Sequence, residues 1–134
     1  PGGRRAPAPD IDQGDAPVDA ILIPDSPITI LEVRSPVRSV DDALDLIAAC
    51  SELGTDRLLL PGSILPEVFF DLHSRFAGAF IQKLLNYRLR VAGVIPPDPA
   101  HGDRFREFLL EAGRGPQFRV FGVRDDAIRW LGEG

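Results

Sequence analysis

The chain has 134 residues, of which 44% are hydrophobic and 26% are charged, and its formal net charge is −5. This length is typical of one domain with one hydrophobic core, and the composition is that of folded globular proteins. No basic stripe with interleaved aromatic residues occurs, which argues against a nucleic-acid surface. Cys50 is the single cysteine, so an internal disulfide and a zinc site built from several cysteines are excluded.

No run approaches the roughly 20 apolar residues that a membrane span needs, so we expect no membrane association. Arg4 and Arg5 are not followed by an apolar segment, and we therefore expect no secretory signal in this stretch. The sequence contains no Met, which suggests a processed or trimmed start. Together these features predict a cytoplasmic protein.

The first part of the sequence changes character near Val18. Residues 1–17 are rich in Pro and Gly and offer little apolar surface to bury, so we predict a flexible tail before a folded domain of residues 18–134. Two β-prone runs follow, Val18–Ile23 and Ile28–Val33. Two prolines lie in the short segment between these runs, a pattern that predicts a hairpin with its turn at this segment.

From residue 39 onward, helical and strand patterns alternate. Amphipathic periodicity predicts helices at residues 39–54, 74–90, 103–113 and 125–131. Ser39 and Asp103 are expected to cap the first and third of these helices. Short apolar runs predict strands at residues 57–60, 91–95 and 118–121. The order β-β-α-β-α-β-α-β-α predicts a single compact α/β domain with a mixed, mostly parallel five-stranded sheet and about four helices.

The helix predicted from Ser74 to Arg90 has the widest apolar stripe in the sequence. The stripe covers about half of the helical wheel and consists of Phe76, Ala77, Phe80, Ile81, Leu84, Leu85 and Tyr87. We therefore expect the sheet and a neighbouring helix to bury it. Gly78, between two alanines, predicts close approach of another backbone. In the preceding helix Cys50 falls on the apolar face, and we expect it to act as a small buried hydrophobic residue.

A cluster of polar residues precedes this central helix. In sheets of this kind ligands gather at the C-terminal edge of the parallel strands. The cluster Asp71, His73, Ser74 and Arg75 falls at this edge and is our candidate functional rim. The loops at the same edge also carry the polar residues Ser63, His101 and Asp103.

The sequence gives little support for a catalytic, metal or cofactor site in this cluster. His73 and His101 with Asp71 or Asp98 are chemically able to hold a metal ion, but no ligand spacing supports them, and we expect no metal. Ser74 lacks the Gly-x-Ser-x-Gly elbow of hydrolases. Neither a P-loop nor a Gly-x-Gly-x-x-Gly motif occurs, so no cofactor is expected. A small-molecule-binding protein or enzyme that uses His73 and His101 remains the alternative function.

Ser74 allows a regulatory interpretation as well as a structural one. A phosphate on Ser74 would meet the free N–H groups and positive dipole of a helix N-terminus, with Arg75 able to pair with it. The structural alternative is that Asp71 or Ser74 simply caps the helix.

The central stretch resembles a bacterial family of unknown function, DUF4180. The resemblance rests on residues 65–67, 69–72, 77–78, 82–83 and 86–88, supported by residues 42–46 and 105–108, and it extends from about Val18 to the end. The family usually has Thr-Gly where this sequence has Ser74-Arg75. Its architecture is similar to that of the sulfate-transporter and anti-sigma-antagonist (STAS) domains.

The resemblance implies a function only through this shared architecture. In STAS domains a kinase phosphorylates a Ser or Thr at the start of the helix after a central strand, which releases a bound partner. Ser74 lies in the comparable place, although the Asp-Ser-Ser-Gly signature of those domains is missing here. We therefore expect a non-enzymatic interaction or regulatory domain whose partner is another protein or a second copy of the chain.

Overall fold

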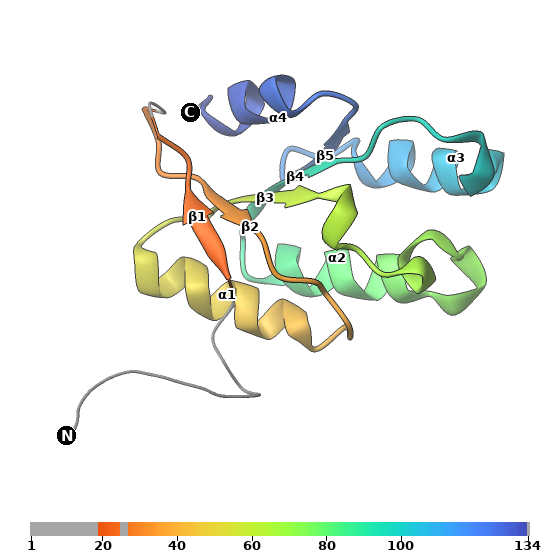
Figure 1. Ribbon diagram of the computed structural model, residues 1–134, viewed down its shortest axis with the longest axis horizontal. Helices are drawn as coiled ribbons and strands as arrows, with labels where there is room; N and C mark the ends of the chain where they lie inside the picture. The colour runs from red at the N-terminus through yellow and green to blue at the C-terminus, as the bar shows by residue number, and fades with distance from the viewer. Residues whose placement is uncertain (1–18, 25–26, 134) are drawn as a thin grey trace.

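A computed structural model describes residues 19–24 and 27–133 as one α/β domain. The predicted tail of residues 1–17 lies outside the described residues, as do residues 25 and 26 in the predicted turn. The fold class inferred from the sequence is confirmed: four α-helices pack on a mixed, mostly parallel five-stranded sheet (Figure 1).

The five strands are arranged in the sheet in the same order as in the chain. They are β1 (Ala20–Leu22), β2 (Leu31–Val33), β3 (Arg57–Pro61), β4 (Arg90–Val94) and β5 (Phe118–Phe121). β1 is antiparallel to β2, whereas β2, β3, β4 and β5 are mutually parallel. β1 and β5 therefore form the two edges of the sheet.

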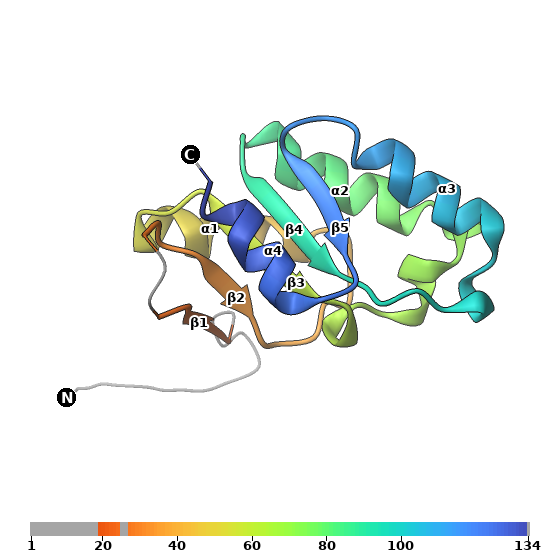
Figure 2. The ribbon, with the colours of Figure 1, turned by 90° about the horizontal axis from the view of Figure 1, so that it is seen from above.

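The helices lie unequally on the two faces of the sheet (Figures 1 and 2). They are α1 (Asp42–Leu53), α2 (Phe76–Asn86), α3 (Asp103–Ala112) and α4 (Arg124–Leu131). Each crossover steps to the next strand in one direction, so crossovers of the same hand put α1, α2 and α3 on one face. No strand follows α4, and this helix folds back over the other face.

The face that carries α1, α2 and α3 holds the larger core. Phe69 lies at its centre and is almost completely buried. Its ring contacts the rings of Phe70, Phe76, Phe80 and Phe105 edge-on, with centroids 5.2–6.5 Å apart. Edge-to-face contacts of this kind contribute about 0.5–1.5 kcal/mol each beyond the burial of apolar area. The aromatic cluster thus joins α2 and α3 to the segment that connects β3 with α2.

The opposite face combines a small apolar core with an ion pair between buried Glu32 and partly exposed Arg124. Its core consists of Ile30, Leu59, Ala92, Ala127, Trp130 and Leu131. Beside it, the guanidinium of Arg124 donates two hydrogen bonds to the Glu32 carboxylate, of 2.7 and 3.1 Å. Glu32 is only 7% exposed. The hydrogen bond to Glu32 raises the pKa of Arg124, and the two charge-assisted hydrogen bonds tie the start of α4 to β2.

The end of α4 is bound through its backbone carbonyls. Arg57 donates to the carbonyls of Leu131 and Glu133, both at 3.0 Å, and Arg90 donates to the carbonyl of Trp130 at 2.9 Å. The Arg90 guanidinium also lies 4.0 Å from the centroid of the Trp130 ring. Cations at the C-terminus of a helix satisfy its free carbonyls and oppose its dipole. α4 is therefore held at both ends by charged side chains from the sheet.

Two predicted helix caps are wrong in detail. Ser39 does not cap α1; instead the Asp42 carboxylate accepts hydrogen bonds from the backbone N–H groups of Arg38 and Ser39, at 2.7 and 3.1 Å. Asp103 is the first residue of α3 rather than its cap, because the chain enters that helix through Gly102 at a φ of 81°. At α1 the carboxylate of another residue thus takes the hydrogen bonds, and at α3 a glycine conformation replaces the expected side-chain cap.

The central helix is shorter than the sequence predicts. α2 begins at Phe76 rather than Ser74 because Arg75 adopts a left-handed backbone conformation, with a φ of 62°. It ends at Asn86, and Arg88 is also left-handed, with a φ of 63°. Tyr87 was expected on the buried stripe, but it lies past the last helical residue and is 57% exposed.

Candidate functional site

The candidate rim lies on a segment of three short 3-10 turns between β3 and α2. These turns are η1 (Gly62–Ile64), η2 (Glu67–Phe70) and η3 (Leu72–Ser74). Phe69 of η2 anchors the segment in the aromatic core, and Phe70 stacks on the ring of His101 with a centroid distance of 4.3 Å. The rim residues are therefore exposed on a segment whose position is set by buried aromatic side chains.

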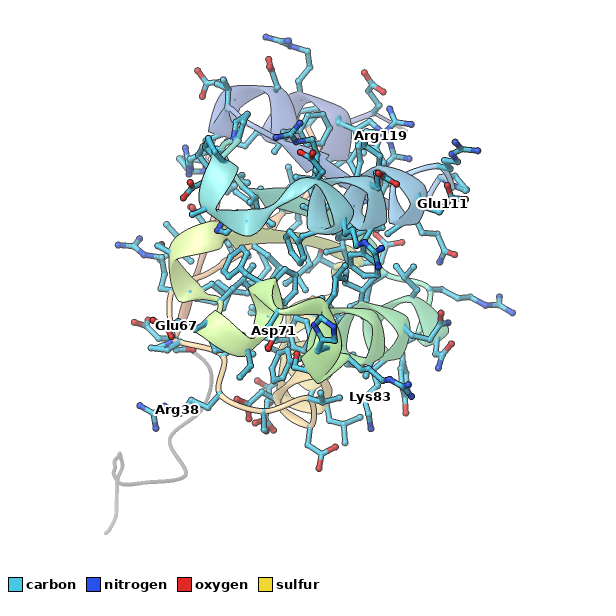
Figure 3. The ribbon with its side chains drawn as sticks, turned by 90° about the vertical axis from the view of Figure 1, so that its right-hand side faces the viewer. Arg38, Glu67, Asp71, Lys83, Glu111 and Arg119 are labelled. Atoms are coloured by element: carbon cyan, nitrogen blue, oxygen red, sulfur yellow. The ribbon has the colours of Figure 1, made fainter. Side chains whose placement is uncertain are left out.

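Asp71 organises the turn that follows it. Its carboxylate accepts a hydrogen bond of 3.0 Å from the backbone N–H of His73, which makes Asp71 the cap of η3. The ring Nδ1 of His73 lies 3.6 Å from the same carboxylate. The side chain of His73 is fully exposed to solvent, so this contact is screened by water. Figure 3 shows Asp71 at the surface between Glu67 and Lys83.

The hydroxyl of Ser74 is held by the backbone around it. Its oxygen lies 2.5 Å from the Val68 carbonyl and 2.6 Å from the Asp71 carbonyl, and it accepts a 3.1 Å hydrogen bond from the N–H of Phe76. A hydroxyl carries one proton, so the two carbonyls share a single donor. Ser74 thus links η2, η3 and the start of α2, but the cap residue of α2 is Arg75, and Asp71 caps η3 rather than the helix.

Arg75 joins η3 to α2 through its unusual backbone conformation. A φ of 62° is uncommon for a residue with a side chain and favours glycine. This geometry is a physical reason for the Thr-Gly pair that the family resemblance implies at positions 74 and 75. In this chain an arginine adopts the left-handed conformation and adds an exposed positive charge beside Asp71.

Asp71 and Arg75 border a shallow apolar depression of about 380 Å³. Its floor is formed by Leu72, residues 77–79 and Phe108 of α3. Gly78 forms part of this floor, and a Cβ there would meet only the Phe108 ring, at an ordinary contact distance of 3.9 Å. The predicted close approach of a backbone at Gly78 is therefore wrong. Phe108 was missed as a site residue because its helical spacing marked it as core.

The two histidines do not share a described cavity. His101 lines a groove on the far side of Phe70 together with Ser63 and Asp98, and its Nε2 lies 3.9 Å from the Asp98 carboxylate. His73 projects into solvent and lines none of the described cavities. The polar residues that were expected to share one rim therefore lie at two separate places, with Asp71–Arg75 on one side of the segment and His101 on the other.

The described part of the chain contains no group of three or more His, Cys, Asp or Glu side chains placed to hold a metal ion. Within the same residues, no helix is both long enough and apolar enough to cross a membrane. Cys50 of α1 is buried in the core, and burial, with a smaller contribution from Asp56, raises the pKa of its thiol to about 11. The thiol is therefore protonated near neutral pH and is not poised as a nucleophile.

Comparison with protein families gives one match. The sequence pattern of the family described as "Domain of unknown function (DUF4180)" matches residues 25–131, which is most of the chain. The chain belongs to the DUF4180 family. This match spans β2 to α4 and includes the whole segment from η1 to α2. Neither the curated proteins nor the solved structures that were compared give a match to this DUF4180 chain.

Proposed function

We propose that this DUF4180 chain is a bacterial, cytoplasmic, STAS-like interaction domain without catalytic activity that binds a protein partner at the surface around Asp71–Arg75. The observation that carries the proposal is the apolar depression bordered by Asp71 and Arg75. An apolar centre with a charged rim is the usual make-up of a protein–protein contact. The depression is wide enough to receive an apolar side chain of a partner, while the two rim charges would orient that partner.

Ser74 is the proposed regulatory position. Transfer of the terminal phosphoryl group of ATP to Oγ would replace the hydroxyl proton that serves the carbonyls of Val68 and Asp71. The added group carries a charge of about −1.5 to −2 at neutral pH and would lie close to the Asp71 carboxylate. Loss of the donor and repulsion between like charges would both rearrange η3. Phosphorylation is thus expected to reshape the rim and weaken partner binding.

The experiment blocks the depression without disturbing the backbone. Gly78→Gln places a long side chain over the floor, and it is expected to stabilise α2 because Gly is about 1 kcal/mol less favourable than good helix formers. Gly115→Gln is the matched control, since Gly115 is exposed and a Cβ there meets no atom within 4 Å. Tagged full-length chains are used to capture partners from the native host, with mass spectrometry of partners and of the peptide containing Ser74.

The expected result is a specific partner that is captured by the wild type and by Gly115→Gln but lost with Gly78→Gln, although Gly78→Gln melts at an equal or higher temperature. Equal capture of the partner by all three chains would show that the partner does not bind at the depression. Ser74→Asp is an unsuitable mimic, because a carboxylate cannot donate the hydroxyl hydrogen bonds. Regulation is therefore tested by phosphorylation stoichiometry: partner-bound chains should carry less phosphate on Ser74 than free chains.

A further inference from the structure

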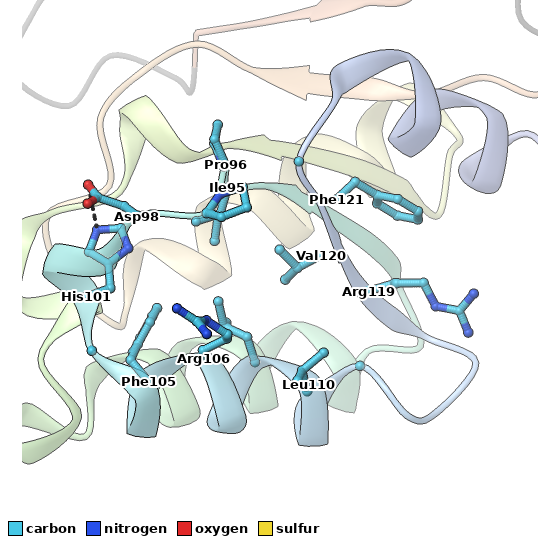
Figure 4. A pocket seen from close by; sticks show the side chains of 15 residues that line it. Ile95, Pro96, Asp98, His101, Phe105, Arg106, Leu110, Arg119, Val120 and Phe121 are labelled. Carbon is cyan, nitrogen blue, oxygen red and sulfur yellow. Dashed lines mark ion pairs between the residues drawn. The ribbon is translucent and has the colours of Figure 1, made fainter.

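A second surface lies at the edge of the sheet formed by β5. There a groove of about 400 Å³ runs between α3 and the ends of β4 and β5 (Figure 4). Its lining is mainly apolar and includes Ile95, Phe105, Leu109, Leu110 and Val120. The Arg106 side chain lies at its mouth, whereas Arg119 points away to the other face of the sheet (Figure 4). The groove does not include Asp71–Arg75, so it is separate from the proposed partner surface.

One wall of the groove is an open strand edge. In the described residues β5 pairs with β4 alone. The N–H of Val91 donates to Gln117 at 2.7 Å and the N–H of Ile95 donates to Phe121 at 2.9 Å. Backbone groups alternate in direction along a parallel strand, so those of Gln117 and Phe121 face β4 while those of Val120 face outward. An outward-facing N–H and C=O beside an apolar groove form a template for an added strand.

Side chains on a strand paired with this edge would alternate between two environments. On one side they would enter the apolar groove above α3, next to Val120 and Leu109. On the other side they would meet Arg119, whose guanidinium lies 5.3 Å from the Trp130 ring and has no ion pair with a carboxylate among the described residues. Arg106 adds positive charge at the mouth, because its contact with Asp103 is exposed and long, at 3.8 Å.

We propose that the groove between β5 and α3 binds an extended peptide of alternating apolar and acidic residues, which pairs with β5 as a sixth strand. Main-chain hydrogen bonds to an edge strand give affinity in such complexes, and pockets for alternate side chains give specificity. The apolar residues occupy the groove and the acidic residues face Arg119. Charge disfavours a second copy as the occupant, since two antiparallel β5 strands related by a two-fold axis would bring both Arg119 side chains onto one face.

The test uses the full chain and a blocked heptapeptide with Val or Ile at odd positions and Asp or Glu at even positions. A peptide of the same composition without alternation is the control ligand. Amide shifts are followed by NMR up to about 1 mM peptide, a range that detects weak but specific binding. The expected result is saturable binding of the alternating peptide, with the largest shifts at residues 118–122 and at least tenfold weaker binding of the control.

Two variants separate the contribution of backbone pairing to peptide binding from that of charge. Val120→Pro removes the outward N–H while leaving the ladder to β4 intact, and Val120→Thr is its control. Arg119→Glu reverses the charge, and Arg129→Glu on exposed α4 is its control. Val120→Pro and Arg119→Glu should each weaken binding about tenfold or more, and the controls should not. The proposal would be overturned if the control peptide bound as tightly as the alternating one, or if neither Val120→Pro nor Arg119→Glu weakened binding. Shifts that do not saturate, or self-association through β5 in place of peptide binding, would also overturn it.

Discussion

The two faces of the sheet are held together in different ways. On the face of α1, α2 and α3, aromatic rings around Phe69 pack against one another and against the sheet. On the face of α4, a helix of 8 residues is fastened by Glu32–Arg124 at one end and by Arg57 and Arg90 at the other. This short helix buries Ala127, Trp130 and Leu131, and charged hydrogen bonds at its two ends fix its position on the sheet. On the face that carries α1, α2 and α3, by contrast, close packing of apolar side chains positions the candidate sites.

The difference predicts where the domain is sensitive. Apolar burial in a packed core is hard to replace, because removal of a large side chain leaves a cavity. A charged contact behaves differently: removal of one partner is costly, while removal of both partners is often harmless. Three substitutions test this contrast, in order of decreasing expected effect.

Phe69→Ala should cause the largest loss. It removes the ring that joins η2, α2 and α3, and substitutions of this kind cost about 3–5 kcal/mol of unfolding free energy. Urea denaturation of the full chain, followed by circular dichroism, measures the change. The neighbouring Val68→Ala is the control, because Val68 is substantially exposed and should cost less than about 1 kcal/mol. Similar losses for the two variants would contradict the central role of Phe69.

Arg124→Met should have an intermediate effect. It leaves the Glu32 carboxylate buried without its partner, and because Arg124 is itself partly exposed we expect a loss of about 1–3 kcal/mol rather than the full cost of a buried pair. The double variant Glu32→Met/Arg124→Met should recover most of this loss. Arg129→Met, which breaks an exposed pair with Asp126, should change the unfolding free energy by less than about 0.5 kcal/mol. A double variant as unstable as the single one would mean that the charges themselves are required.

Cys50→Ala should have the smallest effect, a change in how the free energy of unfolding depends on pH. Burial raises the pKa of its thiol from 9.0 to about 11, so the folded state keeps the proton that the unfolded state loses. This stabilisation is complete below about pH 9 and declines as the pH rises toward 11. Between pH 9 and 10 the wild type should therefore lose about 1 kcal/mol more than Cys50→Ala, measured by urea denaturation. Parallel pH profiles for the two proteins would show that the thiol does not contribute.

The central segment shows how far local patterns reach. Its apolar spacing correctly placed Phe76, Ala77, Phe80, Ile81 and Leu84 in the core, because helical periodicity is a property of the sequence itself. The start of the helix was placed two residues too early. The left-handed conformation of Arg75 and the hydrogen bonds of Ser74 depend on carbonyls that the 3-10 turns bring together, and no residue spacing encodes them.

The candidate sites depend even more on contacts between distant residues. Asp71 and Arg75 were identified from the sequence as polar residues at a helix start, but the depression beside them exists because Phe108 of α3 packs across α2 at Gly78. His101 was paired with His73 in the sequence, whereas stacking on Phe70 holds it on the other side of the segment. Side-chain stacking over a sequence separation of about 30 residues leaves no periodic signal.

The sequence alone determined the order of the elements and the mostly parallel sheet, because alternating strand and helix patterns permit few connections. It also identified the family through the stretch around α2 and the match over residues 25–131. The tertiary structure alone decided that α4 covers the second face, that β5 is an open edge above α3, and that the two histidines are separated. These outcomes depend on which buried side chains meet, such as Glu32 with Arg124, and such pairings arise only when the chain is folded.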